Sequence, residues 1–199
     1  MSVAVLEKFL PVNALSFLQI WFGVYPCHLK ITKSRNSKLG DYRKLPDTSH
    51  QITINGTLEP QLFFFVLTHE LAHLIAFEKY GRRISPHGKE WKDTFREMLL
   101  ESINVYQEDL KPIILRFSRS PKANFMASPE LVKYFHRETE EGMVFIENLQ
   151  IGESFAYKNE NFVIEEAAKK RYLCKNLNSG RKYYFKCLAQ VIKIENEND

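Results

Sequence analysis

The chain has 199 residues, 44% of them hydrophobic, and it contains 15 Phe, 9 Tyr and 2 Trp. This apolar content is sufficient for a buried core and excludes an intrinsically disordered chain. The formal net charge of +4 is modest, so it defines no partner by itself and the distribution of charge matters more. Three widely spaced cysteines form no CxxC pair and leave an odd thiol. Because this usage is typical of a reducing compartment, we predict a cytoplasmic protein.

The first long uncharged stretch is interpreted as a core helix and not as a targeting or membrane segment. Residues 9–29 contain no Lys, Arg, Asp or Glu, but two prolines and several polar residues interrupt them. Glu7-Lys8 precedes the stretch where a signal would carry clear positive charge, and no small-residue cleavage site closes it. Apolar residues recur at helical spacing after Pro11, which predicts a helix over residues 11–24 and no membrane span.

A small sheet and a buried helix are predicted next. Residues 28–33 and 51–54 alternate in polarity, and residues 38–42 between them contain turn-forming types. This pattern predicts two or three strands. Residues 60–79 are densely apolar, which predicts a helix buried on most of its circumference, and Gly81 provides its stop.

A further helix, a connector and an all-β segment follow. Ser85-Pro86 provides an N-cap and a first helical position, and a stripe of apolar residues extends the helix over residues 86–102. Residues 106–141 predict a connector that contains a short helix over residues 128–135. Beyond Gly142, short β-type runs separated by turns predict a small barrel or curled sheet. These runs are residues 143–146, 154–157, 162–164, 171–174, 182–185 and 191–194.

The segment His69-Glu70-Leu71-Ala72-His73 carries the most specific chemical signal. Two histidines four residues apart on a helix project from the same face, so both imidazoles can bind one tetrahedral Zn²⁺. Glu70 lies about 100° around the helix from His69, where it borders the metal and can accept a proton from the attacking water. Chance would give roughly 0.02 such motifs in a chain of this composition. The alternative is a pair of satisfied core histidines, which so apolar a helix would not bury without a reason.

A catalytic zinc needs a third protein ligand and an open fourth position. His87 is the first candidate, because it falls in the first predicted turn of the next helix and shares the inward face of Trp91, four residues later. A carboxylate is the alternative ligand, either Glu90 or Glu97. The other histidines are weaker candidates, since they lie near predicted strands or amid charged residues; they are His28, His50 and His136.

The HELAH motif, a short basic turn and His87-Gly-Lys-Glu-Trp91 together resemble the SprT-like metallopeptidases, the family that includes Spartan. The similarity extends to a helix and a small sheet before the motif, here Leu15 to Phe22 and Leu29 to Ile54. It covers residues 1–105 and implies an α+β fold with a minimal gluzincin-like metallopeptidase domain there. The resemblance also implies His87 as the third ligand and proteolysis of proteins associated with DNA.

The C-terminal part departs from that family, many members of which carry a zinc ribbon with paired CxxC motifs. Only Cys174 and Cys187 are present in this part, and two thiolates without a nearby histidine cannot complete a tetrahedral structural site. We therefore predict one catalytic zinc and a metal-free, small β-barrel-like module over residues 142–199. Cys174 and Cys187 are expected to face each other as buried thiols with a packing role.

Two segments concentrate positive charge. Lys169–Cys187 carries seven basic residues, no acidic ones and four interleaved aromatic residues, and Lys30–Lys44 carries six basic residues against Asp41. Such a mixture on a small β-module can neutralise phosphates and stack bases, so a nucleic-acid partner is one interpretation of these segments. The alternative is an ordinary sheet with aromatic residues inward and basic residues outward, and the pattern slightly favours that alternative.

These features predict a zinc-dependent endopeptidase acting on a protein or peptide. The three histidines would hold Zn²⁺, and Glu70 would act as general base and then as proton donor to the leaving amine. No oxyanion donor can be chosen from the sequence, and Tyr80 and His50 are the alternatives. A second hypothesis is a non-catalytic, zinc-containing module that docks on nucleic acid or on another protein, although the intact Glu70 argues against it.

Overall fold

The computed structural model describes residues 3–35, 38–135, 142–169 and 171–194. Helices and strands occur in two units, Met1–Leu131 and Val132–Asp199. The first unit contains a three-stranded sheet with helices, and the second contains a six-stranded sheet. The predicted α+β class is therefore confirmed.

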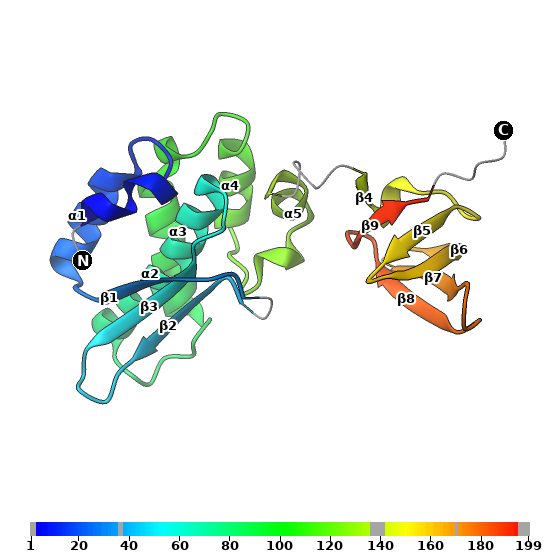
Figure 1. Ribbon diagram of the computed structural model, residues 1–199. Helices are drawn as coiled ribbons and strands as arrows, with labels where there is room; N and C mark the ends of the chain where they lie inside the picture. The colour runs from blue at the N-terminus through cyan, green and yellow to red at the C-terminus, as the bar shows by residue number, and fades with distance from the viewer. Residues whose placement is uncertain (1–2, 36–37, 136–141, 170, 195–199) are drawn as a thin grey trace. The chain divides into compact units, whose positions relative to one another are not determined.

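The first unit packs its helices against one face of the three-stranded sheet (Figure 1). The strand order is β1-β3-β2, in which β1 (His28–Thr32) runs parallel and β2 (Gly40–Lys44) antiparallel to the central β3 (His50–Asn55). This arrangement confirms the predicted small sheet. The helical elements of the unit are η1 (Val3–Phe9), α1 (Ala14–Val24), α2 (Pro60–Tyr80), α3 (Lys89–Glu101), η2 (Ile103–Val105), α4 (Lys111–Ser118) and η3 (Phe125–Ala127). The boundary between the units falls within α5 (Pro129–Phe135).

The helix that carries the histidine motif, α2, begins and ends at residues suited to those positions. The Glu59 carboxylate accepts hydrogen bonds from two backbone N–H groups of the first turn, and Pro60 occupies a position that needs no N–H. Gly81 follows the last turn with a φ of 80°, a conformation that favours glycine. The predicted helix over residues 60–79 and its stop are confirmed.

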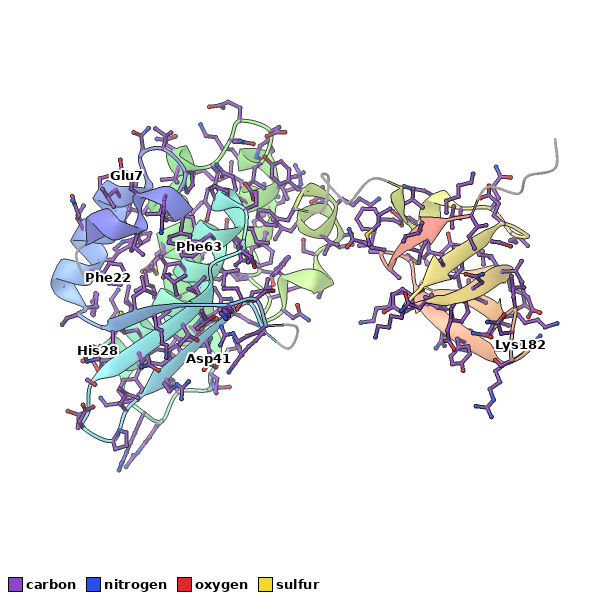
Figure 2. The ribbon with its side chains drawn as sticks, viewed as in Figure 1. Glu7, Phe22, His28, Asp41, Phe63 and Lys182 are labelled. Carbon is purple, nitrogen blue, oxygen red and sulfur yellow. The ribbon has the colours of Figure 1, made fainter. Side chains whose placement is uncertain are left out.

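Most of α2 is buried, so it forms the centre of the first unit. Phe63, labelled in Figure 2, is fully buried. Its ring stacks on that of Phe9, with centroids 5.4 Å apart. Phe65 packs edge-to-face on Phe95 of α3 and Phe117 of α4, at 5.6 and 5.5 Å. Among the described helices, α2 alone has the length and composition of a membrane span, but 78% of that window is buried within the protein. We therefore interpret it as a core helix.

The start of α3 differs from its prediction. The helix begins at Lys89, because residues 85–88 form a turn in which the Gly88 N–H donates to the Ser85 carbonyl at 2.9 Å. Ser85-Pro86 is therefore part of a turn and not a helix cap. As a result, His87 lies in the turn before α3, where its side chain is placed by the turn and not by a helical face.

The helix α4 was not expected within the predicted connector. Pro112 stands in its first turn, which tolerates proline, and Ile114 and Phe117 are buried on one side. Phe117 contacts Phe95 of α3 with ring centroids 6.1 Å apart. The two buried residues are too few to give a clear helical stripe amid the basic residues of this segment.

The second unit is an open antiparallel sheet, in which all six predicted runs form strands. They are β4 (Met143–Phe145), β5 (Ser154–Tyr157), β6 (Glu160–Ala168), β7 (Arg171–Asn176), β8 (Lys182–Lys186) and β9 (Gln190–Lys193), with η4 (Ile146–Asn148) after β4. The order β4-β9-β5-β6-β7-β8 leaves β4 and β8 unpaired with each other over the described residues. Over the described residues the sheet is therefore not a closed barrel, and the predicted barrel-like form is not confirmed. A bulge between Ile164 and Glu166 bends β6, but β4 has only three residues and pairs with β9 alone.

Candidate metal centre

Three imidazoles meet beside α2. His69 and His73, one helical turn apart, have ring centroids 5.1 Å apart, and the turn before α3 brings His87 within 5.5 and 4.6 Å of them. One ring nitrogen from each histidine lies within 4.8 Å of the others. The Nε2 atoms of His73 and His87 are 3.1 Å apart, close to the spacing of about 3.3 Å between two nitrogens of a tetrahedral zinc site. The group could hold a metal ion.

The environment favours neutral imidazoles, which is the form that binds metals. Burial, together with the neighbouring histidines, lowers the pKa of His69 to about 3 and that of His73 to about 4. Burial and the nearby Lys92 also lower the pKa of His87. At neutral pH the three rings therefore offer lone pairs, and this donor set fits a catalytic zinc.

Trp91 forms a common wall for the three rings. The indole is fully buried at the start of α3, and its centroid lies 4.7 Å from His69, 5.2 Å from His73 and 4.7 Å from His87. Its Nε1–H donates to the His69 carbonyl at 3.5 Å. Because one rigid side chain touches all three histidines, it restricts the rotamers that each of them can adopt.

Glu70 occupies the side of α2 that faces β2. Its side chain is buried, and the backbone N–H of Tyr42 favours its ionised form. Burial and the nearby Asp41 raise the pKa of Glu70 to about 7, against the opposite effects of the Tyr42 N–H, Lys38 and Arg35. A carboxyl group with a pKa near neutrality can both accept and return a proton.

Gly40 of β2 provides the space that Glu70 fills. A β-carbon at this position would lie 2.7 Å from Oε1 of Glu70 and 2.8 Å from Cγ1 of Val66. The φ of Gly40 is not positive, so the requirement for glycine comes from space and not from backbone conformation. Glycine within a strand often marks such a close approach.

Tyr42 connects the imidazoles with the end of the sheet. Its ring is parallel to His73, at 6.1 Å and 3°, and to His50, at 5.8 Å and 15°. Its hydroxyl lies 2.9 Å from Nδ1 of His50, and Nε2 of His50 lies 3.0 Å from Oε1 of Glu78. When Nε2–H donates to Glu78, Nδ1 accepts the proton of the Tyr42 hydroxyl. Burial, with Glu78, raises the pKa of Tyr42 to about 12, which keeps the phenol protonated.

The residues that build this centre all fall within one recognised domain. Residues 26–108 match the SprT-like family, and this range contains β1, β2, β3, α2 and α3. Residues 26–108 therefore form a SprT-like domain. The resemblance drawn from the HELAH motif and His87 is thereby confirmed.

Relatives of the SprT-like chain share part of its length. Protein SprT of Vibrio parahaemolyticus is 42% identical over 60 residues, which are 28% of this chain and 36% of the relative. Protein SprT of Glaesserella parasuis is 50% identical over 34 residues, which are 17% of this chain and 21% of the relative. Protein SprT of Pseudomonas fluorescens strain SBW25 is 34% identical over 61 residues, 29% and 37%. The chain thus matches between 21% and 37% of the length of these relatives. No solved structure matches it.

The other predicted site residues of the SprT-like chain are separate from the imidazole group. His28 is exposed on β1, Tyr80 is 52% exposed at the end of α2, Glu97 is exposed on α3, and Glu90 does not belong to the group of donors. His50 reaches the centre only through Tyr42. His136 lies outside the described residues. Gly40 and Tyr42 were not predicted as site residues, because residues 38–42 were interpreted only from their turn-forming types.

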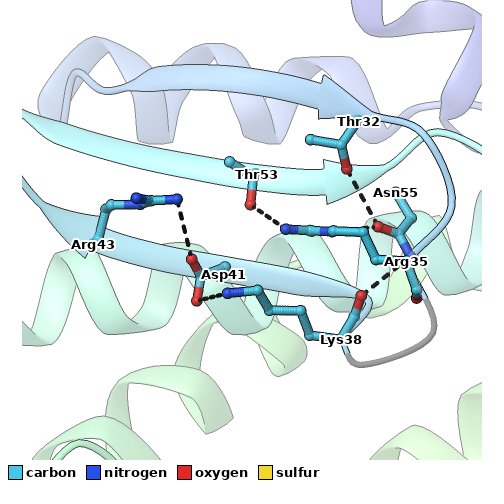
Figure 3. Close-up of polar contacts among 7 residues, drawn as sticks. All are labelled: Thr32, Arg35, Lys38, Asp41, Arg43, Thr53 and Asn55. Carbon is cyan, nitrogen blue, oxygen red and sulfur yellow. Dashed lines mark hydrogen bonds and ion pairs between the residues drawn. The ribbon is translucent and has the colours of Figure 1, made fainter.

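The outer face of the three-stranded sheet carries a polar network (Figure 3). Asp41 pairs with Lys38 at 2.9 Å and with Arg43 at 3.6 Å. Arg35 donates hydrogen bonds to two side chains of β3, at 2.9 and 3.1 Å. Several basic residues of Lys30–Lys44 therefore make internal contacts. The structure of this segment therefore favours a nucleic-acid surface less than its number of basic residues does.

The basic and aromatic segment of the second unit is arranged differently from a simple inward and outward alternation. Tyr183 and Tyr184 of β8 are 42% and 63% exposed, whereas Phe185 is buried. The Arg171 guanidinium lies over the Tyr184 ring, 4.6 Å from its centroid. The expectation that the aromatic residues face inward is therefore wrong for these two tyrosines. Lys170 of the same segment lies outside the described residues.

The two C-terminal cysteines do not face each other, contrary to the prediction. Cys174 is buried in β7 opposite Tyr183, whereas Cys187 follows Lys186, which lies opposite Arg171. The strand register therefore separates the thiols by several residues along the sheet. Burial raises the pKa of Cys174 to about 11, which suits a packing role.

Proposed function

We propose that the first unit is a gluzincin-like, zinc-dependent endopeptidase domain. The observation that carries the proposal is the convergence of His69, His73 and His87 beside the buried carboxyl of Glu70. Three neutral imidazoles leave a fourth coordination position for water or substrate, which is the arrangement of a catalytic zinc and not of a structural one. Membership of the SprT-like family supports the same assignment.

The residues of the centre divide the chemistry between them. A bound zinc ion would act as a Lewis acid that lowers the pKa of water and polarises a peptide carbonyl. Glu70 would take a proton from the attacking water at a carboxylate oxygen and return it to the leaving amine nitrogen. Its raised pKa suits both transfers near neutral pH. Trp91 and Tyr42 would keep the imidazoles in position during the reaction.

We also propose that the substrates are proteins, including proteins associated with DNA, in the cytoplasm. The resemblance to SprT-like peptidases supports this substrate class. The exposed tyrosines and the basic residues of the second unit supply a surface that could bring the enzyme to a nucleic acid.

Removal of the metal tests the proposal directly. The purified protein is expected to contain one equivalent of zinc and to cleave casein or histone, with chelation abolishing cleavage and added zinc restoring it. Elemental analysis and digestion assays, with and without single-stranded DNA, measure both quantities. A protein that binds no zinc under these conditions would contradict the central assignment.

A smaller side chain change tests the placement of Glu70. Gly40→Ala puts a methyl group within 2.7 Å of the carboxyl oxygen, so Glu70 must move. We expect activity to fall about 10–100-fold, because a displacement of about 1 Å in a reacting group can cost this much. Zinc content is expected to stay at one equivalent, since the three atoms nearest to the added methyl group belong to Glu70 and Val66 and not to an imidazole.

The matched control is Gly23→Ala in α1, where an added β-carbon meets no atom within 4 Å. That variant is expected to keep full activity and, because Gly23 is the second-last residue of α1, to gain at most about 0.5–1 kcal/mol of stability from the poor helix propensity of glycine. Unchanged activity in Gly40→Ala would show that Glu70 needs no fixed position. Thermal unfolding and digestion assays distinguish these results.

A second candidate function is a docking module that binds nucleic acid without catalysis. It is favoured by one observation, the pair of exposed tyrosines on β8 with the Arg171 guanidinium over Tyr184. Aromatic faces beside basic residues suit single-stranded nucleic acids. Zinc without cleavage, combined with salt-dependent binding to single-stranded DNA that Tyr184→Ala weakens, would support this candidate over the peptidase.

A further inference from the structure

We infer that Tyr42 is a positioning residue of the metal centre, which holds Glu70 through its main chain and His73 through its ring. The inference rests on the proposed function and deepens it. It assigns to one strand residue the alignment of the general base with a metal ligand. Tyr42 itself would touch neither the metal nor the substrate.

The main chain of Tyr42 is available for this role because of its place in the sheet. β2 is an edge strand that pairs only with β3. On one side of Tyr42, the Leu39 carbonyl accepts a hydrogen bond from the Asn55 N–H. On the other side, the Leu45 N–H donates to the Ser49 carbonyl, so both groups face β3. Since alternate residues of a strand point in opposite directions, the Tyr42 N–H faces the free edge of β2, and it favours the ionised form of the Glu70 carboxyl.

The ring of Tyr42 is fixed independently of the imidazole that it contacts. His50, only 8% exposed, sits between the Tyr42 hydroxyl at 2.9 Å and Glu78 at 3.0 Å. Phe77 packs edge-to-face with His50, with ring centroids 5.9 Å apart. The chain of contacts from Glu78 through His50 therefore defines the plane of Tyr42, and the His73 ring lies within 3° of that plane.

The residues of α2 that contact Tyr42, His50 and Lys44 lie close together along the helix. His73, Phe77 and Glu78 follow one another on α2 within about one and a half turns. The Lys44 ammonium group also lies at this end, 4.4 Å from the Phe77 ring centroid and 3.7 Å from Oε1 of Glu78. A packing role alone would need the apolar contacts but not the directed hydrogen bonds of Tyr42 and His50.

Zinc affinity and the cobalt spectrum test the inference without relying on activity. Residues that orient a metal-binding histidine from outside the ligand sphere typically contribute 10–100-fold to affinity. We expect Tyr42→Leu to weaken zinc binding by about that factor and to alter the visible absorption of the Co²⁺-substituted protein. Tyr42→Phe, which keeps the ring and loses only the hydroxyl, is expected to show a smaller loss that His50→Gln reproduces.

The double variant Tyr42→Phe with His50→Gln separates positioning from packing. Each substitution removes one partner of the same contact, the Tyr42 hydroxyl or the His50 ring nitrogen, so their effects on zinc affinity should not add. Tyr106→Phe, which removes a buried hydroxyl from the same unit, should leave affinity and spectrum unchanged. If Tyr42→Leu fails to fold, the zinc affinities of Tyr42→Phe, His50→Gln and the double variant test the inference instead.

Two results would overturn the inference. Wild-type affinity and an unaltered cobalt spectrum in the Tyr42 and His50 variants would remove the positioning role and leave the peptidase proposal intact. A wild-type protein that binds no zinc would overturn both. Chelator competition on the full chain supplies the affinities for either conclusion.

Discussion

Glu70→Gln is expected to lower kcat for peptide hydrolysis by about 10²–10⁴-fold, the range typical of a lost general base. The amide keeps the size of the carboxyl and can still accept the Tyr42 N–H, but it cannot take a proton from water. The three imidazoles are unchanged, so one equivalent of zinc should remain bound. Steady-state hydrolysis of a peptide and elemental analysis of the same sample measure both effects.

The control for this variant is Glu97→Gln, which makes the same charge change on α3. The Glu97 side chain is 69% exposed and pairs with Lys79 at 3.8 Å, so its loss should leave activity within about twofold, as expected for an exposed ion pair. Equal activities of Glu70→Gln and wild type would remove Glu70 from the mechanism. Loss of zinc in Glu70→Gln would instead assign the carboxyl a structural role.

The histidine pair and the glutamate could be predicted because their arrangement is local. A spacing of four residues on one helix places His69 and His73 on one face whatever surrounds the helix. The start of the helix at Pro60 and its stop at Gly81 are also local signals. These parts of the prediction therefore agree with the structure, and so do the six short strands of the second unit.

The support around the centre depends on pairing between distant segments and could not be predicted in the same way. Gly40 is close to Glu70, and Tyr42 to His73, only because β2 pairs antiparallel with β3 and packs on α2. Trp91 was predicted as part of an apolar stripe, but its contact with three imidazoles requires the α2 and α3 arrangement. Sequence periodicity identifies the buried face and not the neighbour that it meets.

The errors in the second unit have the same physical origin. Short β-type runs predict strands, but closure into a barrel depends on which strands pair, and here β4 and β8 remain at opposite edges. The prediction that Cys174 and Cys187 face each other required a particular register between β7 and the end of β8. The alternation of polar and apolar residues does not determine that register. The exposed Tyr183 and Tyr184 likewise depend on which face of an edge strand is covered.

His87→Ala is expected to reduce zinc affinity by more than about 100-fold, the upper end of the effect of residues outside the ligand sphere. Two imidazoles on one helical face would remain, which is too few ligands for a tetrahedral catalytic site. His87 lies in the turn closed by Gly88 and Ser85 and not inside α3. The helices should therefore survive the substitution, and activity should be lost together with the metal.

Chelator competition and circular dichroism of His87→Ala measure the loss of metal and the survival of the fold. His28→Ala is the matched control, because His28 is exposed on β1 and does not belong to the imidazole group. Glu90→Gln and Glu97→Gln test the carboxylate alternative for the third ligand. Wild-type zinc affinity in His87→Ala, with a loss in either glutamate variant, would move the third ligand to α3. The 3.1 Å separation between the Nε2 atoms of His73 and His87 supports the opposite result, since two neutral imidazoles approach so closely when they share a proton or a cation.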